Sequence, residues 1–141
     1  MPKLDAPIVG IHFRPPAKDV LAQLGSGTAL LLQREPNNAY DENAVMVLLP
    51  GFGENGLHAD LAAGLLATGN WPEEAFTNPL HIGYVDAAKT GMAKMFAQVM
   101  DENDTPSVMA KLAFDPAGKP IVETELVPYE EPEVLSFDAG N

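Results

Sequence analysis

The sequence predicts a small, mainly β protein, a barrel of about six strands with one or two α-helices packed on it. Short runs of β-branched and aromatic residues recur along the chain between turns rich in Pro, Gly and Asn. These runs are not separated by the regular crossover helices that a doubly wound sheet requires. A length of 141 residues, with 46% of them hydrophobic, fits one domain with its own core.

The first third of the chain predicts three strands and a short helix. Residues 7–13 (PIVGIHF) form a strand-like run that stops at a Pro-Pro pair, which cannot continue a β-ladder. Residues 18–24 have the apolar spacing of one or two helical turns. The apolar runs at 28–34 and 44–49 flank the turn-forming segment 35–43, so we expect them to pair as a hairpin with a long, ordered loop.

Residues 50–79 interrupt this rhythm with several glycines and prolines, and they read as an insertion with a short helix near 59–66. A strand at 81–85 follows. Asp86 is then a plausible N-cap for a helix. The residues expected on the apolar face of that helix are Ala88, Met92, Met95, Phe96 and Val99.

Two strands at 107–114 and 120–127 are joined by the hairpin-type turn Asp115-Pro116-Ala117-Gly118-Lys119. We therefore expect a folded domain over 1–128 and an acidic C-terminal tail over 129–141. The distribution of charged residues along the chain supports this division, because residues 120–141 contain six of the 20 acidic side chains and no Lys or Arg.

The net charge of −12 argues against a nonspecific grip on phosphate backbones or anionic membranes, so any contact with nucleic acid must be local. Cys is absent, which excludes disulfides and thiolate chemistry and fits an intracellular protein. No apolar run approaches the roughly 20 residues that span a bilayer. We expect a cytoplasmic protein of a bacterial or phage-infected cell.

Common enzymatic signatures are missing: the sequence has no phosphate-binding glycine loop, no dinucleotide fingerprint, no HExxH and no GxSxG. The three histidines, His12, His58 and His81, are scattered rather than spaced for a metal ion. We expect a non-enzymatic protein without catalytic residues, metal or cofactor.

The segment from Gln33 to Val47, QREPNNAYDENAVMV, stands apart. It resembles the signature of the HIRAN domain, approximately R-[DE]-P-x-N-x-Y-D-x-N-A-[VI]-x-V. The flanks agree with this, because residues 9–13 look like the family's first strand and residues 82–85 (IGYV) resemble the strand that precedes its helix. These elements lie in family order over most of residues 7–127.

This resemblance implies a modified OB-like barrel that captures the 3′-terminal nucleotides of single-stranded DNA. HIRAN domains occur on DNA translocases that remodel replication forks and as small free-standing proteins, so repair, replication or mobile-element biology is the expected context. A helicase or nuclease is a conceivable protein partner. The residues expected to contact DNA are His12, Phe13, Arg14, Arg34, Tyr40, Asp41, Tyr84 and Lys89.

The chemistry of these side chains suits a strand end. A carboxylate such as Asp41 accepts a hydrogen bond from a terminal 3′-hydroxyl and repels a continuing phosphodiester. Aromatic rings at Phe13, Tyr40 and Tyr84 would stack on bases. Arg34, Lys89 and Arg14 would hold phosphates.

Each residue also has a structural interpretation. Asn37, Asn38 and Asn43 could instead cap turns, and Asp41 could hold the same loop shut. Arg34 could pair with Glu35 or with the acidic tail. The family commonly has Arg then Tyr where this chain has His12 and Phe13, which weakens the expected attraction for phosphate. Asp86 stands where relatives are often basic.

Two other functions compete with DNA-end binding. In the first, the barrel is a protein-interaction or inhibitory module whose acidic surface contacts a basic partner, which predicts an acidic surface around the site. In the second, which we disfavour, the protein is a metal-dependent nuclease, with Asp41, Glu42 and Asp86 as the only plausible ligand cluster. DNA-end binding instead predicts a local basic groove beside Tyr40 and Asp41.

Overall fold

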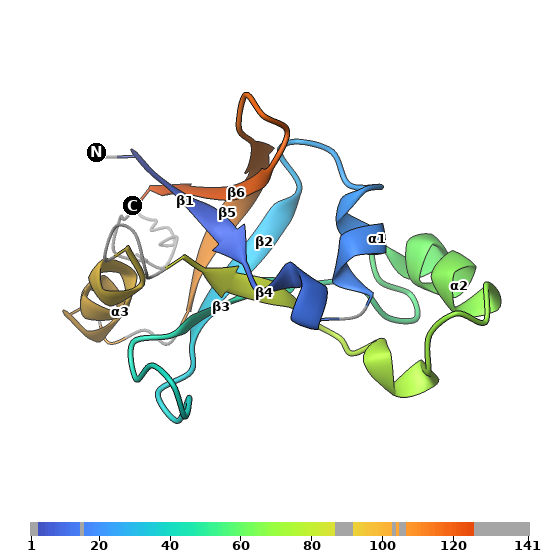
Figure 1. The fold of residues 1–141 in the computed structure, drawn as a ribbon, viewed down its shortest axis with the longest axis horizontal. Helices are drawn as coiled ribbons and strands as arrows, with labels where there is room; N and C mark the ends of the chain where they lie inside the picture. The colour runs from blue at the N-terminus through green and yellow to red at the C-terminus, as the bar shows by residue number, and fades with distance from the viewer. Residues whose placement is uncertain (1–2, 15, 87–91, 103, 105–106, 126–141) are drawn as a thin grey trace, which may run out of the picture.

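A computed structural model describes residues 3–14, 16–86, 92–102, 104 and 107–125. The chain folds into a β-barrel, with helices α1 and α2 at one end of the molecule and α3 at the other (Figure 1). The N-terminal strand runs alongside the last strand, so the described part of the chain closes on itself.

The barrel is closed and antiparallel, with the strand order β1-β4-β3-β2-β5-β6. The expectation of a mainly β barrel of about six strands with helices packed on it is confirmed. The strands are β1 (Lys3–Val9), β2 (Ala29–Arg34), β3 (Val45–Leu49), β4 (Leu80–Val85), β5 (Ser107–Phe114) and β6 (Pro120–Glu125).

The core fills the barrel because alternate side chains of each strand point inward. On β2, Leu30 and Leu32 are fully buried, while Leu31 between them is partly exposed. Val45 and Val47 on β3 repeat this pattern. The expected hairpin of β2 and β3 is present, with Leu32 opposite Val47 and Arg34 opposite Val45.

The first strand differs from the expected 7–13. It begins earlier, at Lys3, and ends at Val9, and Ile11–Phe13 form a 3-10 helix. The cause is Gly10, whose φ of 75° lies in the left-handed region and turns the chain out of the sheet. Phe13 and Arg14 therefore leave the barrel wall.

The helices are α1 (Ala17–Leu21), α2 (Ala59–Ala67) and α3 (Met92–Glu102). On α3, Phe96 and Met100 are buried, but Met95, which we expected on the apolar face, is 42% exposed. The stripe that faces the core includes Ala97 instead. The expected N-terminal part of this helix, including Ala88, and the C-terminal tail lie outside the described residues.

Within segment 50–79, α2 lies beside α1 at one end of the molecule (Figure 1). Phe52 is buried, and its ring stacks on that of Phe76 with centroids 6.1 Å apart. The indole nitrogen of Trp71 donates a hydrogen bond to Asp19 Oδ2 on α1, at 3.2 Å. Trp71 therefore links the segment to the rest of the fold.

Candidate nucleic-acid interface

A hollow of about 640 Å³ lies where the β2–β3 loop, the 3-10 turn after β1 and strand β4 meet. This volume falls within the roughly 300–1,000 Å³ of small-molecule sites. The lining residues come from all three segments, and none comes from segment 50–79. They are Gly10, Phe13, Arg14, Glu35, Asn37, Asn38, Ala39, Tyr40 and Tyr84.

The β2–β3 loop is held in shape by its own polar side chains. Asn38 Oδ1 accepts hydrogen bonds from the backbone N–H groups of Tyr40 and Asp41, at 2.9 and 3.0 Å. Asp41 Oδ1 accepts one from the N–H of Asn43, at 2.9 Å. The structural interpretation is therefore confirmed for Asn38 and Asp41. The tightened loop leaves the Tyr40 side chain 97% exposed.

Glu35 connects this loop to the barrel wall. Its Oε1 atom accepts a hydrogen bond from Asn38 Nδ2 and another from the Tyr84 hydroxyl, both at 2.7 Å. Partial burial would raise the pKa of Glu35, but these two hydrogen bonds and the nearby His81 and Arg14 outweigh it and lower that pKa. Glu35 is therefore a carboxylate at neutral pH.

The Tyr84 ring contacts two further side chains, Arg14 and His81. The Arg14 guanidinium carbon lies 5.8 Å from the centroid of the Tyr84 ring, within cation–π range. The His81 ring meets Tyr84 edge-on, with centroids 4.7 Å apart, and Nε2 hydrogen-bonds to the Gly83 carbonyl oxygen at 2.9 Å. Burial and then Arg14 lower the pKa of His81, so its ring is neutral at pH 7.

Burial and the hydrogen bond to Glu35 raise the pKa of Tyr84 above its ordinary value. Its hydroxyl therefore stays protonated and remains a donor to Glu35.

A second, smaller hollow of about 320 Å³ shares Asn38, Tyr40 and Tyr84 with the first and adds Asp41 and Asp86. Tyr40 and Tyr84 thus line both hollows. A ligand that crossed from one to the other would pass from Arg14 and Glu35 to two further acidic side chains. The described residues around the two hollows are mixed in charge. They form neither the basic groove that DNA-end binding predicts nor the acidic surface that a protein-interaction module predicts.

Of the residues expected to contact DNA, the fold brings Phe13, Arg14, Tyr40 and Tyr84 together around the first hollow and Asp41 around the second. Phe13 is 73% exposed. His12 does not line the first hollow, but its ring lies 4.1 Å from that of Phe13, centroid to centroid. Lys89 lies outside the described residues.

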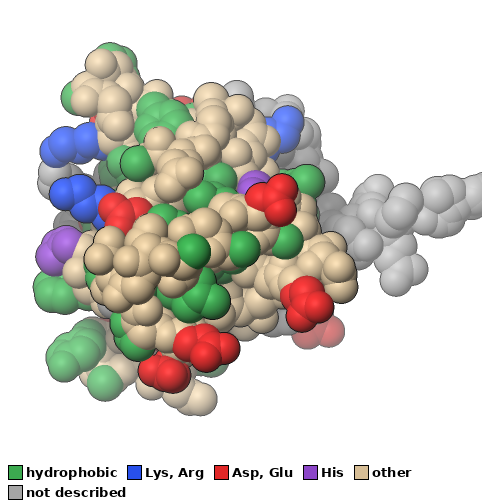
Figure 2. Space-filling model, turned by 90° about the vertical axis from the view of Figure 1, so that its right-hand side faces the viewer, with side chains coloured by type: hydrophobic (Ala, Val, Ile, Leu, Met, Phe, Trp, Pro, Cys, Tyr) green, Lys and Arg blue, Asp and Glu red, His purple; other side chains and the backbone are tan. Residues whose placement is uncertain are grey.

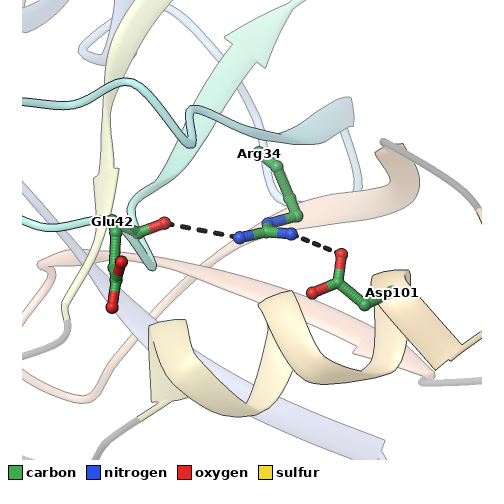
Figure 3. Close-up of polar contacts among 3 residues, drawn as sticks. All are labelled: Arg34, Glu42 and Asp101. Atoms are coloured by element: carbon green, nitrogen blue, oxygen red, sulfur yellow. Dashed lines mark hydrogen bonds and ion pairs between the residues drawn. The ribbon is translucent and has the colours of Figure 1, made fainter.

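Arg34 lies elsewhere. Its side chain reaches α3, where Nη1 forms an ion pair with Asp101, and Nη2 donates to the backbone carbonyl of Glu42 at 3.3 Å (Figure 3). The side chain is only 19% exposed, and it does not line either hollow. Arg34 thus pairs with Asp101 rather than with Glu35, and the acidic tail lies outside the described residues. A contact between Arg34 and phosphate stays a prediction.

Sequence reasoning missed Glu35 and His81 as parts of the site. Glu35 stands in the R-E-P run of the motif, but we considered it only as a partner for Arg34. The useful signal was the strand alternation, which places Arg34 and Glu35 on opposite sides of the chain. His81 carried no such signal, because its role depends on the ring of Tyr84 three residues later.

Charge is unevenly distributed over the face that carries α1 and α2. Acidic side chains are scattered over the middle and lower parts of this face, whereas Lys and Arg side chains lie at its margins (Figure 2). Among the described residues, no three His, Asp or Glu side chains are grouped so that they could hold a metal ion. No helix in the described part of the chain is long and apolar enough to cross a membrane.

Comparison with protein-family models, with curated proteins and with solved structures finds no match.

Proposed function

We propose that this protein is a HIRAN-like, non-enzymatic module that binds the 3′ ends of single-stranded DNA. The observation that carries the proposal is the pair of highly exposed aromatic side chains, Phe13 and Tyr40, at the rim of a hollow that also contains Arg14. The likeness of residues 33–47 to the HIRAN signature supports it. Repair, replication or mobile-element biology is the proposed context, and the cytoplasm the proposed location.

Stacking supplies the affinity in this proposal. An exposed ring that packs against nothing in its own chain costs little to desolvate against a base, and each stacked base contributes roughly 1–3 kcal/mol. Tyr40 is 97% exposed on a loop that Asn38 holds in place, so the ring is available without rearrangement of the backbone. Arg14 supplies a permanent cation for one phosphate.

The carboxylates supply the selection for ends. Asp41 uses Oδ1 within the loop, and the hydrogen bonds among the described residues leave Oδ2 for a ligand. A 3′-hydroxyl donates to such an oxygen, whereas a 3′-phosphate or a continuing strand brings negative charge toward Asp41 and Asp86, which line the same hollow. Binding should therefore favour a free hydroxyl end.

The test is fluorescence anisotropy with 5′-labelled oligothymidine that ends in either a 3′-hydroxyl or a 3′-phosphate. We expect the wild type to prefer the hydroxyl end. Asp41→Asn keeps the acceptor for the Asn43 N–H but removes the charge, so it should reduce the preference several-fold. Tyr40→Ala should weaken binding of both oligonucleotides by about 5- to 100-fold, the equivalent of one lost stacking contact.

Leu57→Ala is the matched control, because Leu57 is 85% exposed and does not line either hollow. The Leu57→Ala variant should bind both oligonucleotides as tightly as the wild type does. Equal binding of both ends would contradict selection for 3′ ends. No binding at tens of micromolar protein, where even weak nonspecific sites begin to fill, would overturn DNA binding and favour the acidic protein-interaction module.

A further inference from the structure

Glu35 presents an unused hydrogen-bond acceptor in the first hollow. Its Oε1 atom is occupied by Asn38 and Tyr84, and the hydrogen bonds among the described residues leave Oε2 without a partner. The carboxylate is thus anchored on one oxygen and open on the other. A fixed, ionised acceptor of this kind strongly favours ligands with N–H donors.

The neighbouring Asn38 side chain cannot serve as an acceptor for the base in the same way. Asn38 uses its amide nitrogen to donate to Glu35 and its amide oxygen to accept from two backbone N–H groups. Its side chain therefore has little capacity left for a ligand. Glu35 is the acceptor that a base between the aromatic side chains would meet.

The four DNA bases differ in what they offer to a carboxylate. Guanine alone has two adjacent donors on its Watson–Crick edge, N1–H and the 2-amino group. Adenine and cytosine each place one amino donor beside a ring nitrogen acceptor, and thymine flanks its single N3–H with two carbonyl oxygens. A carboxylate meets a repelling acceptor next to the donor on every base except guanine.

We propose that this site prefers guanine as the terminal base and that Glu35 is the residue that determines this specificity. The inference rests on the proposed function, because it assumes that a base enters the hollow beside Tyr40. Tyr84 and Asn38 act as positioning residues, since both donate hydrogen bonds to Oε1 of Glu35 and leave Oε2 for the base.

The test compares 5′-labelled oligothymidines that differ only in the 3′-terminal base, which is guanine, adenine, cytosine, thymine or hypoxanthine. Guanine should bind about five- to tenfold more tightly than thymine, the lower part of the range for a paired contact, because its two donors would share the single open oxygen Oε2. Hypoxanthine lacks the 2-amino group but keeps N1–H, so it should lose most of this gain. Adenine controls for the stronger stacking of a purine.

Glu35→Gln provides the protein side of the test. The amide oxygen of Gln can still accept from Asn38 and Tyr84, but its NH₂ group opposes the donors of guanine, so the ratio of the affinity for guanine to that for thymine should fall to about one. The hypoxanthine comparison needs no variant and therefore holds even if Glu35→Gln alters the loop.

The outcomes separate the two proposals. Equal affinity for all terminal bases, with the preference for a 3′-hydroxyl intact, would overturn the guanine preference and leave the proposed function standing. A preference for guanine that hypoxanthine or Glu35→Gln retains would also overturn the role of Glu35. Failure of every oligonucleotide to bind would overturn the proposed function itself.

Discussion

At the scale of single residues, the side chains that close the β2–β3 loop also place the groups to which we assign binding in the proposed function. Asn38 and Asp41 each use one oxygen to close the β2–β3 loop, which is the structural interpretation of the motif. The same hydrogen bonds aim Tyr40 at solvent and leave Asp41 at the edge of a hollow. The two interpretations of this sequence are therefore compatible, because the closed loop is what presents the exposed groups.

His81 should make the stability of the protein depend on pH, because its surroundings lower its pKa. Because burial and Arg14 lower the pKa of His81 below 6.5 in the folded state, the unfolded chain binds a proton more readily there. Stability from this residue is fully present above about pH 6.5 and declines as the pH falls below it. Carboxylates titrate mostly at lower pH, so the pH range in which His81 reduces stability is separate from theirs.

The measurement is urea unfolding at about pH 7.5 and about pH 5.5 for the wild type and His81→Phe. The wild type should lose stability between these values, and the variant, which keeps an aromatic ring against Tyr84, should lose less. If the two proteins show the same difference between the two pH values, His81 does not account for it.

At the scale of elements, the hairpin of β2 and β3 and that of β5 and β6 were predictable because apolar runs flanked strong turn sequences. Asp115 in the second turn accepts hydrogen bonds from the N–H groups of Ala117 and Lys119, both at 2.9 Å. The end of β1 was not predictable in this way, because Gly10 in PIVGIHF lies inside an unbroken β-type pattern. Only its left-handed φ, set by the fold, ends the strand.

The site was predictable to a similar degree. The motif placed Tyr40 and Asp41 on an exposed loop between two strands, and the structure agrees with that placement. It did not predict that Arg34 would pair with Asp101, because the two residues are 67 positions apart and α3 brings them together. Contacts across the barrel depend on packing rather than on local sequence.

Gly83 fixes how closely β4 approaches β1 next to the site. A Cβ atom at this position would lie 2.7 Å from the carbonyl oxygen of Val9 and 2.8 Å from Cγ2 of Ile8. Gly83→Ala should therefore lower the free energy of unfolding by about 1–3 kcal/mol, the usual cost of forcing extra volume into packed structure. It should also move the neighbouring Tyr84.

Gly64 on α2 is the matched control, because a Cβ atom there would meet nothing within 4 Å. Gly64→Ala should raise stability by about 0.5–1 kcal/mol, since Ala is the better helix former. Denaturant unfolding of both variants measures the contrast. A similar stability for the two would show that β1 yields easily to the added methyl group.

At the scale of the whole molecule, the negative net charge opposes DNA binding, whereas the groups around the two hollows would favour it. A charge of −12 repels DNA at long range, and this repulsion weakens as salt screens it. Among the described residues that line the two hollows, Arg14 is the only Lys or Arg. In the proposed function, affinity for DNA therefore comes mostly from stacking and hydrogen bonds, which salt affects little.

This balance predicts a shallow dependence of affinity on salt. Single-stranded DNA releases counterions in proportion to the phosphates neutralised, with a slope of log affinity against log salt of about −0.7 per phosphate. One phosphate held by Arg14 gives a slope of about −0.7. Anisotropy titrations over a range of salt concentrations measure it, and Arg14→Gln should bring the slope close to zero. A slope steeper than about −3 would require four or more phosphate contacts, more than the cations around these hollows provide, and would move the binding surface to another face of the barrel.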